Sequence, residues 1–171
     1  MKGEKADAIL EFLIPAVEQE AGLTRKVIEA VPADKGDYRP DRRSMSALEL
    51  AWHIAASETF FTTWVVTGEF PEFSKMPEHI KTSKDVVVWY DGQMAANHAK
   101  LKALTGEQCA RELASPMGSL PAIAFIQMMN NHTIHHRGQL TSYLRPMGAK
   151  VPSIYGTSLD DEEAEEAAAK A

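Results

Sequence analysis

Apolar side chains recur every three or four residues in four stretches of the chain, and prolines or glycines separate these stretches. Such spacing puts the apolar residues on one side of an α-helix. We therefore predict four helices, at residues 7–31, 47–67, 83–104 and 119–145, and no strand. Four helices of roughly 20 residues each predict an all-α fold, a four-helix bundle.

Local signals mark where these helices begin and end. Ser46 followed by Glu49 has the spacing of a capping box, and Ser83 is a candidate cap for the third helix. Pro15 inside the first segment predicts either a kink or a later helix start, whereas Pro121 is tolerated in a first helical turn. Residues 33–43 and 69–82 are predicted to be irregular connections.

The length and composition suit one domain. Of the 171 residues, 44% are apolar and 25% are charged, close to the average of globular proteins. We assign residues 1–158 to a single helical-bundle domain and residues 159–171 to a short acidic tail. The alanines and glutamates of the tail predict either a short solvated helix or disorder.

Charge and cysteine content exclude several classes of function. The net charge is −6, and the tail carries most of it, which leaves the rest of the chain nearly neutral. No basic stripe for nucleic acid is present in it. The lone Cys109 excludes a disulfide framework and suits a reducing compartment. No apolar run reaches the roughly 20 residues of a membrane helix, and charged residues interrupt the N-terminus where a signal peptide would be apolar. We expect a cytoplasmic protein that binds neither nucleic acid nor membrane.

The most informative stretch is NHTIHHRGQL at residues 131–140. His132 and His136 are four residues apart, so on a helix they lie on the same face. The apolar series that contains Phe125, Met129 and Leu140 continues through both histidines, which predicts two imidazoles in the buried seam of the fourth helix. Burying polar rings without partners is unfavourable, and a shared metal ion would satisfy both of them.

A third ligand is expected from a facing helix, as in other metal sites of helical bundles. His53 lies in the middle of the second helix, in line with apolar residues, and is the best candidate. His79 lies in a proline-containing connection, and His98 lies near the end of the third helix, where we expect solvent exposure. His135 falls on a polar edge of the fourth helix.

We therefore predict that His53, His132 and His136 bind a divalent transition metal. Three neutral imidazoles suit zinc, nickel, iron or copper rather than magnesium or calcium. Three protein ligands leave a position for water or substrate, as in catalytic metal sites. The alternative is that these histidines are hydrogen-bonded residues of the core.

Other motifs with known chemistry are missing from the sequence. It contains no His-Glu-x-x-His, no Gly-x-Gly-x-x-Gly and no P-loop, so a zincin-type protease and nucleotide chemistry are unsupported. The paired Glu-x-x-His motifs of ferritin-like di-iron sites are also missing. Trp52, Trp64 and Trp89 are predicted to pack in the core.

Several segments together resemble the DinB/YfiT-like family of metal-dependent enzymes. They are DYRP at residues 37–40, AWHIA at 51–55, HTIHHRGQL at 132–140, YLRPMG at 143–148 and VPSIYG at 151–156. The resemblance implies a four-helix bundle with a three-histidine site, frequently in a homodimer. Carried over residue by residue, it assigns the ligands to His53, His132 and His136.

The resemblance also implies a class of chemistry. Characterised relatives include transferases and isomerases that use a low-molecular-weight thiol as cosubstrate. We therefore expect a thiol-dependent transferase or a hydrolase acting on a small molecule, and the alternative is a non-catalytic dimer with a vestigial or adventitious metal site. His135 and Glu58 are candidates to support the ligands, although we expect both on the surface. Tyr155 is expected either to close over the site or to pack.

Overall fold

The computed structural model describes residues 1–116 and 118–169, and most of them are helical. Four long helices dominate: α1 (Gly3–Glu29), α2 (Ala47–Thr67), α3 (Ser83–Lys102) and α5 (Ala122–Leu144). Smaller elements are α4 (Gly106–Ala110), β1 (Glu112–Ser115), β2 (Gly118–Pro121), the 3-10 turn η1 (Arg145–Met147) and α6 (Leu159–Ala169). None of the described helices is long and apolar enough to cross a membrane.

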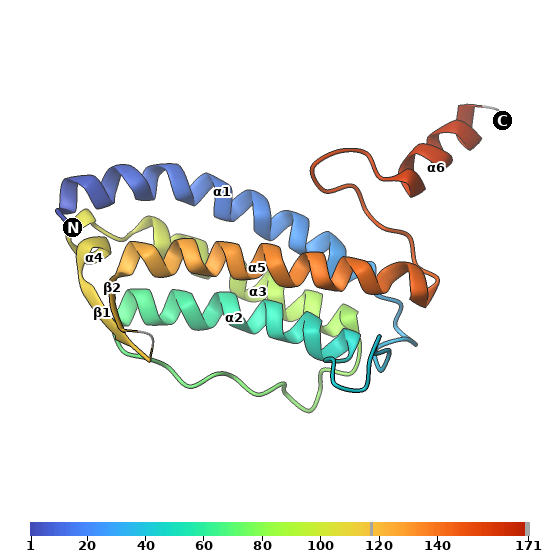
Figure 1. Cartoon of the computed structure of the whole chain (residues 1–171), viewed down its shortest axis with the longest axis horizontal. Helices are drawn as coiled ribbons and strands as arrows, with labels where there is room; N and C mark the ends of the chain where they lie inside the picture. The colour runs from blue at the N-terminus through green and yellow to red at the C-terminus, as the bar shows by residue number, and fades with distance from the viewer. Residues whose placement is uncertain (117, 170–171) are drawn as a thin grey trace.

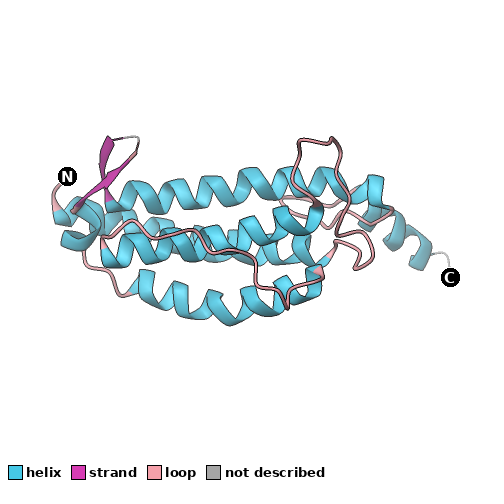
Figure 2. Ribbon diagram, turned by 90° about the horizontal axis from the view of Figure 1, so that it is seen from below, coloured by secondary structure: helices cyan, strands magenta, loops and turns pink. Residues whose placement is uncertain are grey.

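The four long helices lie side by side (Figure 1), and each packs against two neighbours. The contacts run from α1 to α5, from α5 to α2, from α2 to α3 and from α3 back to α1. Helices α2 and α5 run in opposite directions, whereas α2 and α3 run in the same direction. Residues 69–82 therefore travel back along the length of the helices to join α2 to α3, as Figure 2 shows.

The helix starts and stops largely follow their sequence signals. Ser46 forms the predicted capping box with Glu49, and Gly68 ends α2 with a φ of 84°, a left-handed conformation that glycine adopts without strain. Helix α1 continues through Pro15, which lies on the exposed face, where the carbonyl group that proline leaves unpaired can reach water. The cap of α3 is Thr82 rather than Ser83, because the Ser83 hydroxyl donates to the carbonyl of Val31 instead.

The prediction of helices alone was wrong between α3 and α5. Residues 112–115 and 118–121 pair as an antiparallel hairpin, and α4 precedes it. Helix α5 consequently begins at Ala122, not near Ser119. Pro121 pairs with Glu112 in the hairpin and has the extended conformation of an N-cap, φ −64° and ψ 145°.

The C-terminal segment adopts one of the two forms expected for it, the short helix α6. This helix lies apart from the four long helices (Figure 1) and buries none of its described residues. Asp160 accepts hydrogen bonds from Arg145 and from the backbone of Val151, and Asp161 accepts from Ser153. These contacts connect the start of α6 to the end of α5.

Two apolar clusters form the core, one toward each end of the long helices. Buried polar side chains from all four long helices lie between the clusters. Arg137 of α5 forms an ion pair with Glu20 of α1, and Tyr90 of α3 donates a 2.6 Å hydrogen bond to Glu58 of α2. Because buried polar groups are stable only when paired, this layer fixes how the helices are aligned along and around one another.

We predict that Arg137→Ala lowers the free energy of unfolding by about 3–5 kcal/mol, since it leaves the Glu20 carboxylate buried without its partner. Arg145→Ala is the matched control, because Arg145 is more than half exposed in its ion pair with Asp160. Its loss is expected to be below about 1 kcal/mol. Urea unfolding followed by circular dichroism measures both, and equal losses would contradict a structural role for the buried pair.

Candidate metal centre

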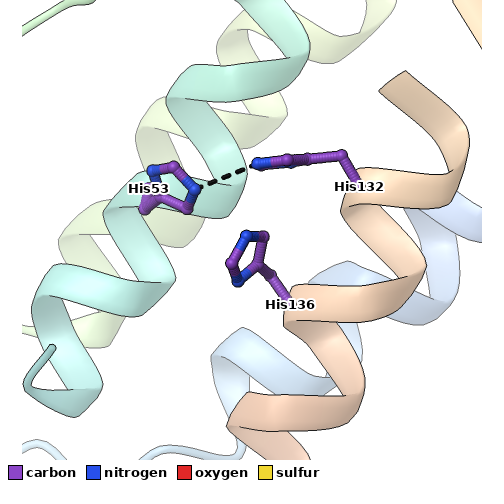
Figure 3. Close-up of side chains that lie close together, drawn as sticks. All are labelled: His53, His132 and His136. Carbon is purple, nitrogen blue, oxygen red and sulfur yellow. Dashed lines mark hydrogen bonds between the residues drawn. The ribbon is translucent and has the colours of Figure 1, made fainter. Parts of the chain in front are cut away.

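The structure brings together the three histidines that the sequence singled out. His53 projects from α2, and His132 and His136 project from consecutive turns of α5 (Figure 3). The Nε2 atoms of His53 and His132 are 3.1 Å apart. Potential ligand atoms of all three rings lie within 4.8 Å of one another.

The histidines are less buried than the apolar series predicted. All three are partly exposed, and the buried face of α5 at this level passes through Met129, Thr133 and Arg137. Successive residues of a helix are rotated by about 100°, so His132 and His136, each one residue before Thr133 and Arg137, lie at the edge of the buried face rather than at its centre. The cluster therefore borders solvent on one side, where a small molecule can approach.

The orientation of the His136 ring follows from its hydrogen-bond partners. Gln139 Nε2 donates to the Tyr143 hydroxyl at 3.4 Å, which directs Gln139 Oε1 toward His136 Nδ1 at 3.0 Å. An amide oxygen only accepts, so Nδ1 of His136 carries the proton. Its Nε2 then has a free lone pair, the form that a metal ligand requires.

Burial keeps the imidazoles neutral. It is the main cause that lowers the pKa of His132 to about 4, and the neighbouring His136, His53 and His135 lower it further. Burial likewise lowers the pKa of His53 and of His136, although the hydrogen bond to Gln139 opposes the shift at His136. At neutral pH the three rings therefore present lone pairs rather than positive charges.

These residues fit a transition metal ion. The Nε2 atoms of His53 and His132 face each other, and the buried Nδ1 of His132 has no hydrogen-bond partner among the described residues. In the hydrogen bond between the two Nε2 atoms, one of them carries the proton, and a cation bound between them would take the place of that proton. Ligand nitrogens of a tetrahedral zinc site are about 3.4 Å apart, close to the distance seen here between His53 and His132.

Aromatic rings lie against two of the three histidines, a contact that was not predicted from the sequence. Phe73, from the connection between α2 and α3, lies against His53 with ring centroids 5.5 Å apart. Phe61 of α2 lies 5.9 Å from His132. A helical pattern cannot place a loop residue such as Phe73, but Phe61 could have been found, because it is eight residues from His53 on the same helix.

The other histidines divide as follows. His135 is exposed, as expected, and its ring is 4.8 Å from that of His136; His79 is also exposed. The expected exposure of His98 was wrong: it is buried, with Nε2 3.2 Å from Glu58 Oε1, within ion-pair distance but not aligned as a hydrogen bond. Glu58 was also expected on the surface and is only 2% exposed, because it belongs to the buried polar layer.

Tyr155 takes neither of the two expected roles. The residue is 66% exposed, and its hydroxyl accepts from Arg137 and donates to Glu20 at 2.6 and 2.8 Å. It therefore contacts the ion pair that joins α1 to α5 and not the histidine cluster. Trp52 and Trp64 are buried in the core as predicted.

The fold and the cluster define a helical protein with a candidate metal centre between two helices. The chain belongs to the DinB family, whose model matches residues 10–168. The resemblance seen in the sequence is thereby confirmed. YjoA of Bacillus subtilis (strain 168), an uncharacterised protein, is 33% identical to this chain over 129 residues, which are 74% of this chain and 82% of YjoA.

Solved structures have the same fold. The crystal structure of YjoA, a DinB-like protein, superposes with a TM-score of 0.71 at 26% identity and covers 85% of this chain and 99% of YjoA. A DinB-like protein from Bacillus cereus gives 0.72 at 21% identity, with 85% and 97% covered. A mycothiol-dependent maleylpyruvate isomerase gives 0.56 at 14% identity, with 77% and 60% covered, and shows the fold alone.

We predict that Gln139→Ala weakens metal binding about 10- to 100-fold, because the His136 ring loses the partner that fixes its tautomer. Gln127→Ala is the matched control, since Gln127 is an exposed residue of the same helix whose amide group donates to Asn131. Competition titration with a zinc-responsive chelator measures both affinities. An unchanged affinity in Gln139→Ala would show that the ring does not depend on this hydrogen bond.

Proposed function

We propose that this protein is a metal-dependent enzyme of a four-helix-bundle type, in which His53, His132 and His136 hold a zinc, nickel or iron ion. Its reaction would be that of a thiol-dependent transferase or a hydrolase. The observation that supports the proposal is the cluster of three imidazoles, with ligand atoms within 4.8 Å of one another. No carboxylate belongs to this cluster among the described residues, so its donors carry no charge.

Such an ion, when bound, would stabilise a thiol as thiolate or lower the pKa of a water molecule. The side chains of this protein have separate tasks. Three neutral imidazoles leave the positive charge of an ion uncompensated, and Gln139 fixes the orientation of the His136 ring. Phe61 and Phe73 lie against the rings of His132 and His53 and shield them from water in part, and all three histidines stay partly exposed.

A thiol from solution is favoured over a thiol of the protein. The one cysteine, Cys109, is fully buried, and burial raises the pKa of its thiol to about 11. It lies in the apolar cluster that contains Phe125 and Met129. The mycothiol-dependent isomerase has the same fold, and we extend its dependence on a small thiol to this chain.

We predict that Cys109 does not react with a chromogenic disulfide at pH 8 in the native protein, because burial keeps the thiol protonated and out of reach. About one thiol should react after unfolding in guanidinium chloride. Rapid reaction in the native state would make Cys109 a candidate nucleophile and remove the argument for a thiol from solution.

The competing function is a non-catalytic dimer whose histidine cluster is vestigial or binds metal adventitiously. Metal content separates the two, because a working site must retain its ion through purification or take it up stoichiometrically afterwards. The homodimer and the cytoplasmic location stay predictions in either case.

We predict that His53→Ala, His132→Ala and His136→Ala each lower bound metal from about one equivalent to below about 0.1, since two imidazoles hold a divalent ion weakly. Protein without a histidine tag is reconstituted with zinc, desalted and measured by elemental analysis. His135→Ala is the matched control: it is adjacent to His136, and its ring is exposed.

Two results would contradict the proposal. Wild-type protein that binds less than about a tenth of an equivalent of zinc, nickel or iron would favour the non-catalytic alternative. Loss of metal in His135→Ala together with retention in His136→Ala would show that the ligands on α5 had been assigned to the wrong turn.

A further inference from the structure

An apolar cavity of about 320 Å³ lies next to the histidine cluster. It is lined mainly by apolar and aromatic side chains from α2, from the loop after α2, from the hairpin turn and from α5: Phe60, Phe61, Trp64, Phe70, Pro116 and Met128. Ser115 also borders it, and its hydroxyl donates to the Gly118 carbonyl. The volume falls within the range of small-molecule sites.

The cavity and the histidine cluster share a wall. Phe61 lines the cavity, and its ring also lies 5.9 Å from that of His132. Met128 lies one helical turn before His132 on α5. On α2, Phe60 follows His53 by seven residues, which is about 10 Å along a helix.

The walls of the cavity are held by contacts between rings. Trp64 is packed against Phe125 in the core, with centroids 4.1 Å apart, and Phe70 lies 4.7 Å from Trp64. Phe73 bridges the cavity wall and the cluster, since it contacts both Phe60 and His53. Phe70 and Phe73 are nevertheless 55% and 43% exposed, so the rim of the cavity presents apolar surface to solvent.

A second, larger cavity does not have these properties. It measures about 410 Å³, lies between α1 and the end of α3, and is lined by Asp7, Glu11, Glu18 and Lys102 together with apolar residues. None of the three clustered histidines contributes to it. The aromatic cavity, unlike this one, combines an apolar lining with contact to a candidate ligand ring.

We infer that the aromatic cavity binds the apolar part of the substrate, an aromatic or branched hydrocarbon group on a small molecule whose polar end reaches the histidines. This inference rests on the proposed function. The cavity residues and the histidines are spaced along α2 and α5, so a chain of a few bonds must join the apolar group of the substrate to its polar end. That chain has to span about 6–10 Å. A charged group would lose its hydration among these rings, so the charged body of a low-molecular-weight thiol is excluded from the cavity. The cavity therefore selects the second substrate, the acceptor.

The test uses one probe with two independent signals, 3-(4-fluorophenyl)propane-1-thiol. Its sulfur reports on a cobalt-loaded cluster through a sulfur-to-cobalt charge-transfer band, and its fluorine reports on burial of the ring through fluorine NMR. Ethanethiol, which has the sulfur but not the ring, is the reference ligand. We expect the aromatic thiol to bind cobalt-loaded protein at least about tenfold more tightly than ethanethiol, because its ring leaves water.

Substitutions locate the ring. Phe61→Ala opens the wall of the cavity. It is therefore expected to reduce the preference for the aromatic thiol over ethanethiol to below about threefold, and to abolish the change in fluorine chemical shift on binding. Phe12→Ala is the matched control, a phenylalanine that is 78% exposed on α1, and should change neither signal. Met128→Trp fills the cavity instead of enlarging it, and it decides the question if Phe61→Ala does not fold.

Each outcome bears on one claim. Equal affinity of the two thiols, or a fluorine shift that survives both Phe61→Ala and Met128→Trp, overturns the inference and leaves the proposed function standing. Absence of a charge-transfer band with either thiol contradicts thiolate binding in the proposed function. In that case the fluorine signal of the metal-free protein, compared between wild type and Met128→Trp, still decides whether the cavity takes the ring.

Discussion

The antiparallel packing of α2 against α5 creates both the histidine cluster and the aromatic cavity beside it. It places His53 opposite two turns of α5, so that ring nitrogens from different helices come within 3.1 Å. Neither helix can form the cluster alone, because His132 and His136 supply only two donors. The same packing sets Phe61 beside Met128 and thereby creates the aromatic cavity. Site and cavity are consequences of one interface.

A buried layer of polar residues holds that interface in place. Arg137, the residue after His136, is rotated from it by about 100° around α5 and pairs with Glu20 of α1. A buried guanidinium group must stay with its carboxylate, which restricts rotation of α5 about its axis. His132 and His136 are thereby kept toward α2. Glu58 and Tyr90 restrict α2 against α3 in the same way. These buried polar contacts lie outside the candidate site and orient it.

Local signals explain why much of the architecture could be predicted from the sequence. The capping box at Ser46, the glycine stop at Gly68 and the helical spacing of His132 and His136 depend on neighbours in the chain. The hairpin at residues 112–121 was missed because its two strands are too short to show alternation. The burial of Glu58 and His98 was missed because partners on other helices determine it. Whether the three histidines hold a metal ion stays a prediction, since spacing and proximity describe the donors and not the ion.

The position of a bound ion tests most directly whether His53, His132 and His136 share one metal ion. Crystals of zinc-loaded, untagged protein measured at the zinc absorption edge would give an anomalous difference map. We predict one strong peak between α2 and α5, about 2.1 Å from a ring nitrogen of each of His53, His132 and His136. A peak coordinated by His135 in place of His136, or zinc bound only at surface carboxylates, would contradict it.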